Sequence, residues 1–419
     1  MNPYTLVILA VVVVGLAVQL WLLSRQVSHV RSHRDAVPST FRDRISLEAH
    51  QRAADYTIAK TRLRQVEEIL GVLLLLFWTL GGGLAVIDRL LGGWVASPRI
   101  EGIAFMVSVV LLMSLLDLPM SVYRTFFLEE RFGFNRVTLP IFIADTIKQT
   151  FLFALLGVPL VWVVLSLMDT AGPAWWFYVW ATWIGFGLFM TWAYPAFIAP
   201  LFNKFTPLED EALRTRVVEL IERCGFRTDG VFVMDSSRRS GHGNAYFMGL
   251  GKQKRIVLFD TLLETLSPAQ VEAVLAHELG HFRCRHVLKR WLLIGTMSLA
   301  GLAALGYVIQ QPQFYSGLGV EIPSSHAALI LFLLVVPYFS LILQPVLGSV
   351  LRAHEFEADD FACRTIAEPS SLREALLRLY RENASTLTPD PLHSAFYDSH
   401  PPAPVRIARI SEKCAVGTE

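Results

Sequence analysis

The chain has 419 residues, of which 53% are hydrophobic and 17% charged. The formal net charge of +1 excludes a strong electrostatic bias, so nothing indicates nucleic acid or an acidic partner as the main ligand. The apolar residues are gathered into long runs instead of the periodic pattern of a soluble core, which predicts a mainly α, polytopic membrane protein. The four cysteines are widely spaced, which is typical of a reducing compartment and predicts no structural disulfide.

Seven apolar runs are long enough to cross about 30 Å of hydrocarbon as helices. They cover residues 4–24, 67–91, 102–121, 151–168, 175–198, 290–309 and 326–347. The first run has no basic leader and no small-residue cleavage site before Arg25, so we expect it to remain as a membrane anchor.

Lysine and arginine are concentrated between the first two runs, from Arg25 to Arg64, whereas none precedes the first run. Because positive residues favour the cytoplasmic side, the amino terminus is predicted to lie outside. Counting spans forward then places residues 122–150, 199–289 and 348–419 in the cytoplasm. Only short loops near residues 92–101, 169–174 and 310–325 are left outside.

The polar segment 199–289 begins with strand-like sequence and ends with a strong helix signal. Short strands are predicted at residues 230–235, 244–249 and 255–260, with a turn between the last two. Ser267 then suits a helix N-cap, Pro268 the first helical position, and Gln270 the reciprocal position of a capping box. A small sheet followed by a capped helix is the predicted local structure.

That helix carries His277, Glu278 and His281. Histidines four residues apart project from one helix face and can share a metal ion, and Glu278 reaches the same face to take a proton from an activated water. This HExxH pattern predicts a zincin-like site with about one Zn²⁺ per chain. The alternative is a solvated helix face with two ordinary histidines. His286 lies past the motif, and no metal role is expected for it.

A catalytic zinc that keeps one position open needs a third protein ligand. A third histidine at the usual spacing is excluded, because Val287 stands there. Glu355 is the best local candidate, and Asp359 lies one turn later on the same face, where it would orient a ligand histidine. His354 and Glu357, on other faces of the same helix, remain alternatives on spacing alone. A further helix near 370–382 and a proline-rich stretch near 400–404 complete the predicted elements.

Several motifs in this order resemble the type I CAAX prenyl protease family, the seven-span membrane gluzincins, and the resemblance covers most of the chain. The motifs are EERFGFN at 129–135, YPAFIAPLFNKFTPL at 194–208, NAYFMG at 244–249, LAHELGH at 275–281, EFEADDFA at 355–362 and SHPP at 399–402 with Arg406. The resemblance implies that Glu355 is the third zinc ligand and that Asp359 supports the site.

The resemblance also implies that Asn244 lies beside the zinc, on a strand that receives an extended peptide together with Ala245 and Tyr246. It implies that His400 and Arg406 contact the substrate or the developing oxyanion. The implied fold has about seven transmembrane helices around a chamber, with a zincin-like α+β catalytic domain on the cytoplasmic side. The predicted parts are a membrane bundle (1–198), a first catalytic part (199–289), spans six and seven (290–347) and a second catalytic part (348–419).

The predicted function is that of a zinc-dependent endopeptidase in the membrane. The resemblance implies that its peptide or protein substrates are cut near a carboxyl-terminal prenylated cysteine. A quality-control protease of broad specificity is the first alternative, and a non-enzymatic transporter or receptor is the second. Charged residues buried mid-span would indicate the second, and these spans contain almost none. The compact loops favour a bacterial source, for which the location would be the cell inner membrane.

Overall fold

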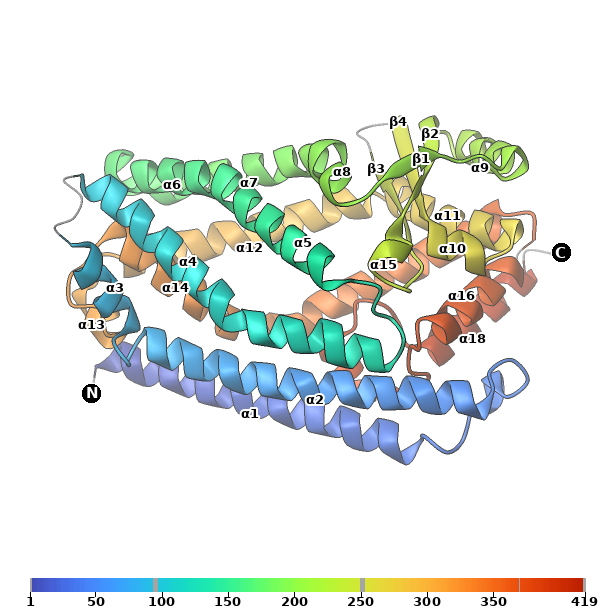
Figure 1. The fold of residues 1–419 in the computed structure, drawn as a ribbon, viewed down its shortest axis with the longest axis horizontal. Helices are drawn as coiled ribbons and strands as arrows, with labels where there is room; N and C mark the ends of the chain where they lie inside the picture. Colours follow the sequence, from blue (N-terminus) through green and yellow to red (C-terminus); the bar gives the residue numbers. More distant parts are fainter. Residues whose placement is uncertain (1, 93–96, 249–252, 369, 417–419) are drawn as a thin grey trace.

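The computed structural model describes residues 2–92, 97–248, 253–368 and 370–416. Long helices run along its longest axis, and the two chain termini lie at opposite ends (Figure 1). The amino-terminal part contains helices α1 (Pro3–Ser32), α2 (Leu47–Trp78), α3 (Gly83–Leu91), α4 (Pro98–Tyr123), α5 (Leu139–Leu152), α6 (Val158–Thr170), α7 (Trp175–Ala193) and α8 (Ala199–Phe202). The carboxyl-terminal part adds helices α12 (His286–Val308), α13 (Pro312–Gly317), α14 (Ser325–Ser340) and α15 (Gln344–Thr365).

Six helices of the described chain are long and apolar enough to cross a membrane, and the bent pair α2–α3 makes up to seven. The seven predicted spans are therefore confirmed. The bend of 48° between α2 and α3 falls on a glycine-rich break. Gly82 there has φ 78°, which side-chain-bearing residues rarely adopt, and a Cβ at Gly81 would lie 2.7 Å from the carbonyl oxygen of Phe77. The second span is thus two helices rather than one.

The helices also extend further than the apolar runs predicted. Helix α2 begins at Leu47, capped by the Ser46 side chain, twenty residues before the predicted span at 67. The predicted loop 122–150 is mostly helical, because continuous helical segments cover Pro98–Glu129 and Leu139–Thr170. Hydropathy detects only the part of a helix that lies in hydrocarbon, so polar extensions beyond the membrane escape it.

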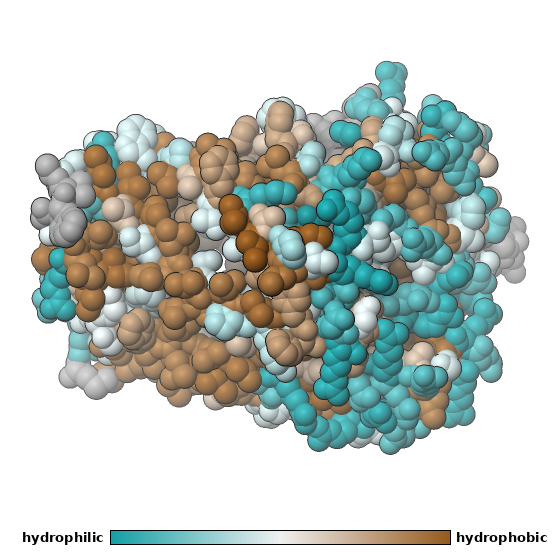
Figure 2. Space-filling model, viewed as in Figure 1, coloured by the Kyte–Doolittle hydropathy of each residue, from teal (hydrophilic) through white to brown (hydrophobic). Residues whose placement is uncertain are grey.

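Figure 2 shows how the surface divides along this axis. One end, over α3, α4, α6 and α7, is predominantly brown and apolar. Helices of the amino-terminal part expose large apolar side chains, among them Leu90, Trp162 and Leu188. The other end, over the sheet and the last helices, is predominantly teal and hydrophilic. Large exposed apolar areas are stable only against lipid or a partner, so the apolar end is the part embedded in the membrane.

A four-stranded sheet lies in the hydrophilic end, with the order β1-β2-β4-β3. Its strands are β1 (Phe205–Pro207), β2 (Arg227–Met234), β3 (Ala245–Met248) and β4 (Gln253–Phe259). Strands β2 and β4 are parallel, and β3 pairs with β4 antiparallel at the edge. The three predicted strands are confirmed, whereas the short, proline-containing β1 was not predicted. The predicted turn after β3 falls largely outside the described residues.

The hydrophobic core around this sheet packs helices from both parts of the catalytic sequence. These are α9 (Glu211–Arg223), α10 (Asp260–Thr265), α11 (Pro268–Arg283), α15, α16 (Ser370–Glu382) and α18 (Ala403–Val416). The Ser267–Gln270 capping box of α11 and the helix at 370–382 are confirmed. Helices α17 (Pro391–Tyr397) and α18 were not predicted, although the proline-rich stretch between them was.

One cysteine differs from the expectation. Cys363 is disulfide-bonded in the structure, whereas Cys224 and Cys284 are free. The prediction of no disulfide is therefore wrong, because wide spacing along a sequence does not report distance in the fold.

Candidate metal centre

The candidate site lies where α11 crosses α15, and a glycine allows the two helices to approach closely. A Cβ added at Gly280 would lie 2.9 Å from the Cα and 3.0 Å from the carbonyl oxygen of Ala358. Both are backbone atoms of α15, which cannot move away by changing a rotamer. Gly280 stands between His277 and His281, so the close approach brings the histidine face of α11 directly onto α15.

Gly280→Ala is therefore expected to force the helices apart. Overpacking of this kind costs about 1–3 kcal/mol of stability, and the shift would also separate the two histidines from Glu355. We expect a lower melting temperature together with weaker zinc retention in a chelator titration. Gly225→Ala is the control for a glycine-to-alanine change away from the site. It introduces backbone strain at φ 79° but no close contact within 4 Å, so it should lower stability without changing zinc retention. A Gly280 variant with unchanged zinc affinity would contradict the packing argument.

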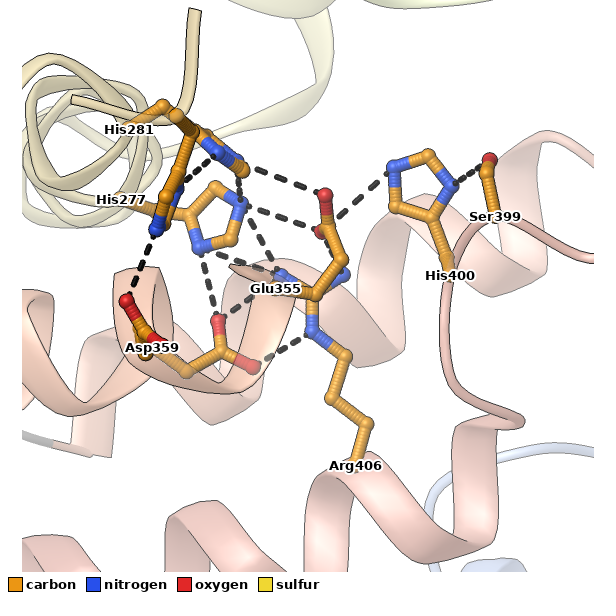
Figure 3. A network of polar contacts seen from close by, with 9 residues as sticks. His277, His281, Glu355, Asp359, Ser399, His400 and Arg406 are labelled. Carbon is orange, nitrogen blue, oxygen red and sulfur yellow. Dashed lines mark hydrogen bonds and ion pairs between the residues drawn. The ribbon is translucent and has the colours of Figure 1, made fainter. Parts of the chain in front are cut away.

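His277, His281 and Glu355 converge on one point (Figure 3). The two Nε2 atoms lie 3.2 Å apart, His277 Nε2 is 3.4 Å from Oε2 of Glu355, and His281 Nε2 is 3.4 Å from Oε1 of the same carboxylate. Four donors placed tetrahedrally about 2.1 Å from one ion would lie roughly 3.4 Å from each other. The three side chains thus already have the separations that a shared zinc ion requires.

The surroundings of Glu355 also fit a cation. Glu355 is 2% exposed, and its Oε2 atom has no hydrogen-bond partner among the described residues. A buried carboxylate oxygen is costly without a compensating donor or metal. Burial and the Arg406 charge lower the pKa of His277, but the neighbouring carboxylates of Asp359 and Glu355 outweigh them and raise it to about 9. The carboxylates therefore favour positive charge at this position, which a divalent ion would supply.

Asp359 holds the other side of His277. Its Oδ1 atom lies 2.8 Å from His277 Nδ1, so the imidazole can present Nε2 to an ion. Arg406 donates two hydrogen bonds to the same carboxylate, from Nε at 2.7 Å and from Nη2 at 2.8 Å. Asp359 is 1% exposed and Arg406 5% exposed, so this ion pair is buried, and the Asp359 carboxylate contacts His277 and Arg406 at the same time. The resemblance implied that Arg406 contacts the substrate or the oxyanion, which stays a prediction; in the structure its guanidinium lies against Asp359, and Nη1 is 3.7 Å from Oε2 of Glu355.

His400 approaches from the opposite side (Figure 3). Its Nε2 lies 3.5 Å from Glu355 Oε2, and its Nδ1 lies 3.0 Å from the Ser399 hydroxyl. Unlike Arg406, its side chain is largely exposed, and it lines an open cavity of about 870 Å³. His400 can therefore reach a molecule bound in that cavity.

Glu278 follows His277 on α11, and burial raises the pKa of its carboxyl above the usual range. A carboxylate with a raised pKa is a better proton acceptor near neutral pH than an exposed one. The predicted base is thus in an environment suited to proton transfer.

The predicted substrate strand also lies beside α11. Ala245 is buried in the catalytic core, Tyr246 faces the opposite side of the sheet, and Asn244 is exposed just before β3 begins. Phe247 of β3 contacts Phe282 of α11, with ring centroids 6.0 Å apart. The structure therefore places the edge strand against the helix that carries the HExxH motif.

One site contact was missed from the sequence. His286 Nδ1 lies 2.9 Å from His281 Nδ1, although no metal role was expected for it. Spacing gave no signal, because residues five apart on a continuous helix point to different faces. His354 and Glu357, the open alternatives for the third ligand, lie near His286 instead of between His277 and His281.

Comparison with known proteins decides the family. Residues 26–204 match the family described as "CAAX prenyl protease N-terminal, five membrane helices", and residues 207–414 match "Peptidase family M48". A CAAX prenyl protease 1 homolog from Arabidopsis thaliana is 35% identical, with 89% of this chain and 90% of its own covered. The chain belongs to peptidase family M48.

Other M48 relatives agree over similar lengths. CAAX prenyl protease 1 from Saccharomyces cerevisiae is 34% identical over 72% of this chain and 71% of its own. The crystal structure of S. mikatae Ste24p has a TM-score of 0.91 and 29% identity, with 98% of this chain and 99% of that chain covered. This M48 protein is thus a membrane metallopeptidase, which confirms the resemblance and excludes the transporter or receptor. The expectation of a bacterial source stays a prediction.

Proposed function

We propose that His277, His281 and Glu355 bind one catalytic Zn²⁺ and that the protein is an endopeptidase. The observation that carries this proposal is the set of donor separations of 3.2–3.4 Å between the two histidines and the buried Glu355 carboxylate, whose Oε2 atom has no hydrogen-bond partner among the described residues. A site of two histidines and one glutamate leaves a fourth position open, as hydrolysis requires. The zinc, when bound, polarises the scissile carbonyl and acidifies the attacking water.

The residues of the chain have separate tasks in that reaction. Glu278 accepts the proton of the attacking water and later delivers it to the leaving amine. Asp359 accepts a hydrogen bond from the Nδ1–H of His277 and so fixes the orientation of that ring. Arg406 keeps the buried Asp359 ionised. His400, which faces the cavity, donates to the oxygen that gains negative charge when the carbonyl is attacked.

The free edge of β3 is the proposed binding site for the peptide backbone. The Asn244 carbonyl accepts from Phe259 N–H at 3.1 Å, so Asn244 and, two residues later, Tyr246 face β4. The N–H of Ala245 points the other way, and the Asn244 side-chain oxygen accepts from it at 2.8 Å. An incoming peptide would replace that local bond by strand addition at Ala245, with Asn244 moving to a substrate group.

Ala245→Pro tests this register. It removes a donor from the free edge and leaves the ladder to β4 intact, and edge strands tolerate proline. We expect KM for an extended peptide to rise by roughly 3–10-fold, which is the value of one hydrogen bond. Ala245 is buried, so the proline ring should also lower the melting temperature, but by less than a substitution that breaks the ladder to β4. Tyr246→Pro is the matched variant: it removes a donor that faces β4 and should lower the melting temperature. If Tyr246→Pro instead raised KM and Ala245→Pro caused the larger loss of melting temperature, the Tyr246 N–H and not the Ala245 N–H would face the substrate.

We further propose that the substrate is a protein cut near a carboxyl-terminal prenylated cysteine, as the names of the relatives indicate for those proteins. The cavity of about 870 Å³ supports a carboxyl-terminal substrate, because it extends from His400 to the cationic side chains of Lys60, Arg64 and Arg124. Arg64 and Arg124 pair with Glu68 and Glu67, whereas no carboxylate of the described residues lies within 4 Å of Lys60. Lys60 Nζ lies 4.8 Å from the ring centroid of Tyr56, which leaves its positive charge unneutralised and able to attract the terminal carboxylate of a peptide.

Matched peptides with and without the prenyl group test this specificity. We expect kcat/KM for the prenylated CAAX peptide to exceed that of the unmodified peptide by at least about tenfold, since buried methylene groups each contribute about 0.8 kcal/mol. Equal rates, with comparable cleavage of unrelated peptides, would instead favour the quality-control protease, which would use the same zinc chemistry.

The proposed orientation places the amino terminus outside and the zinc site in the cytoplasm. Arg25 pairs with Asp390 at 2.8 Å, and Phe41 is buried in the catalytic core, so the basic segment lies at the catalytic end. Basic residues favour the cytoplasmic side, so the zinc site, which lies at the same end of the molecule, is cytoplasmic as well. In a bacterium the location would be the inner membrane. The division into bundle (1–198, 290–347) and catalytic parts (199–289, 348–419) belongs to the same proposal.

A further inference from the structure

A second chain of polar groups leads away from the metal centre through His281. The Nδ1 atom of His281 lies 2.9 Å from Nδ1 of His286, and Nε2 of His286 lies 3.0 Å from an oxygen of Glu357. His286 is 1% exposed, and its ring stacks on His354 with centroids 4.0 Å apart and an interplanar angle of 14°. A buried imidazole held on both nitrogens and on one face has a fixed orientation.

The backbone is shaped to make this contact. On an unbroken helix, five residues rotate a side chain by about 140°, nearly to the opposite face from His281. Instead α11 ends at Arg283 and α12 starts at His286, with Arg285 between them in the left-handed region at φ 56°. Such a conformation is unfavourable for a residue with a side chain and persists only where the surroundings fix it. The break turns His286 back toward the histidine on the last turn of α11.

The hydrogen atoms follow from the role of His281 as a ligand. A neutral imidazole that offers Nε2 to an ion carries its hydrogen on Nδ1. His281 Nδ1–H must then donate to His286 Nδ1, which leaves the hydrogen of His286 on Nε2, where it donates to Glu357. The two contacts are therefore compatible with one arrangement of protons in which every group is satisfied.

We propose that His286 and Glu357 are positioning residues that fix the tautomer and ring orientation of His281 for zinc binding. This inference rests on the proposed ligation of zinc by His281. His286 does for His281 what Asp359 does for His277, by accepting from Nδ1. The two supports differ in strength: Asp359 is buried against Arg406, whereas Glu357 is about half exposed and also pairs with Lys289 at 3.4 Å. The His281 side is thus the weaker of the two.

Zinc affinity of the purified full-length protein, measured by competition with a chromophoric chelator, tests the proposal. Loss of such a supporting group typically lowers metal affinity by 10–100-fold. We expect that loss for His286→Leu, and a loss near the lower end for Glu357→Ala. His286→Gln should retain affinity, because its carboxamide can accept from His281 and donate to Glu357. Cys284→Ser is the control in the same turn: the Cys284 sulfur lies within 4.8 Å of donor atoms of His286 and Glu357, and a serine of nearly the same size leaves the His281–His286 contact in place, so zinc affinity should not change.

The melting temperature of the zinc-free protein separates positioning from simple packing. A positioning role predicts weaker zinc binding in His286→Leu and normal binding in His286→Gln, although the two zinc-free variants have similar melting temperatures. Wild-type affinity in His286→Leu, or equal weakening by Leu and Gln, would overturn the proposal. If His286→Leu does not fold, Glu357→Ala decides, and wild-type affinity there overturns it. A wild type that binds no zinc would overturn the proposed ligands themselves and not only the role of His286. His281→Ala tests those ligands separately, because it loses zinc if His281 is a ligand.

Discussion

Glu278→Gln is expected to abolish peptide cleavage while the protein keeps its zinc. The substitution is nearly isosteric and removes only the ability to accept and deliver a proton. General acid–base groups contribute about 10²–10⁴-fold to rate, so kcat should fall by that factor. His277, His281 and Glu355 do not depend on Glu278 for their arrangement. Their hydrogen bonds and ion pairs are with each other and with Asp359, His286, His400 and Arg406.

The measurement is kcat for a fluorogenic peptide together with metal content on the same preparations. Asn244→Ala is a useful comparison, because it should raise KM more than it lowers kcat. A Glu278→Gln protein that cleaves as fast as wild type would show that another group is the base. Loss of zinc from that variant would mean that Glu278 supports the metal site instead of the proton transfer.

Arg406→Met is expected to have the largest effect on stability. It leaves the carboxylate of Asp359, which is 1% exposed, without the guanidinium that donates two hydrogen bonds to it. Removing one member of a buried ion pair costs about 3–5 kcal/mol. The free energy of unfolding should fall by that amount in denaturant titrations of the detergent-solubilised protein.

The double variant Arg406→Met with Asp359→Leu provides the control. Replacing both members of a buried pair by apolar residues is often nearly neutral, so stability should recover. Zinc affinity should not recover, because His277 loses the acceptor that orients its Nδ1–H. Recovery of both properties would contradict the role of Asp359, and an unchanged stability in Arg406→Met would contradict the role of the ion pair.

The metal centre was predictable to the extent that its residues lie close in sequence. The capping box and the four-residue spacing defined the helix and the histidine pair from local rules alone. The third ligand comes from another helix, and spacing left Glu355, His354 and Glu357 open. Which of these three residues lies beside the histidines depends on the face of α15 that packs on α11. The close contact between Gly280 and Ala358 defines that face.

The contacts that support the ligands were less accessible. Arg406 follows the metal helix by more than a hundred residues and reaches Asp359 because α18 packs on α15 and α16, an arrangement that no local pattern encodes. His286 required knowledge of a helix break at Arg285, a residue with no sequence preference for φ 56°. Long-range packing and a locally unfavourable conformation thus set the parts that the sequence did not predict.

The membrane part shows a similar division. Apolar runs located the seven spans, because hydrocarbon thickness imposes a length that sequence reports directly. They did not report that α2 begins at Leu47 or that it bends before α3, since polar helix extensions and glycine breaks lie outside that constraint.

Metal content of the purified wild type beside Glu355→Gln tests the central claim most directly. The account predicts about one zinc per wild-type chain, as in other sites with this donor set, and loss of most of that zinc in the variant at equal concentrations of chelator. A wild type that holds no zinc, or a variant that holds it equally well, would contradict the assignment of His277, His281 and Glu355 as the catalytic metal site.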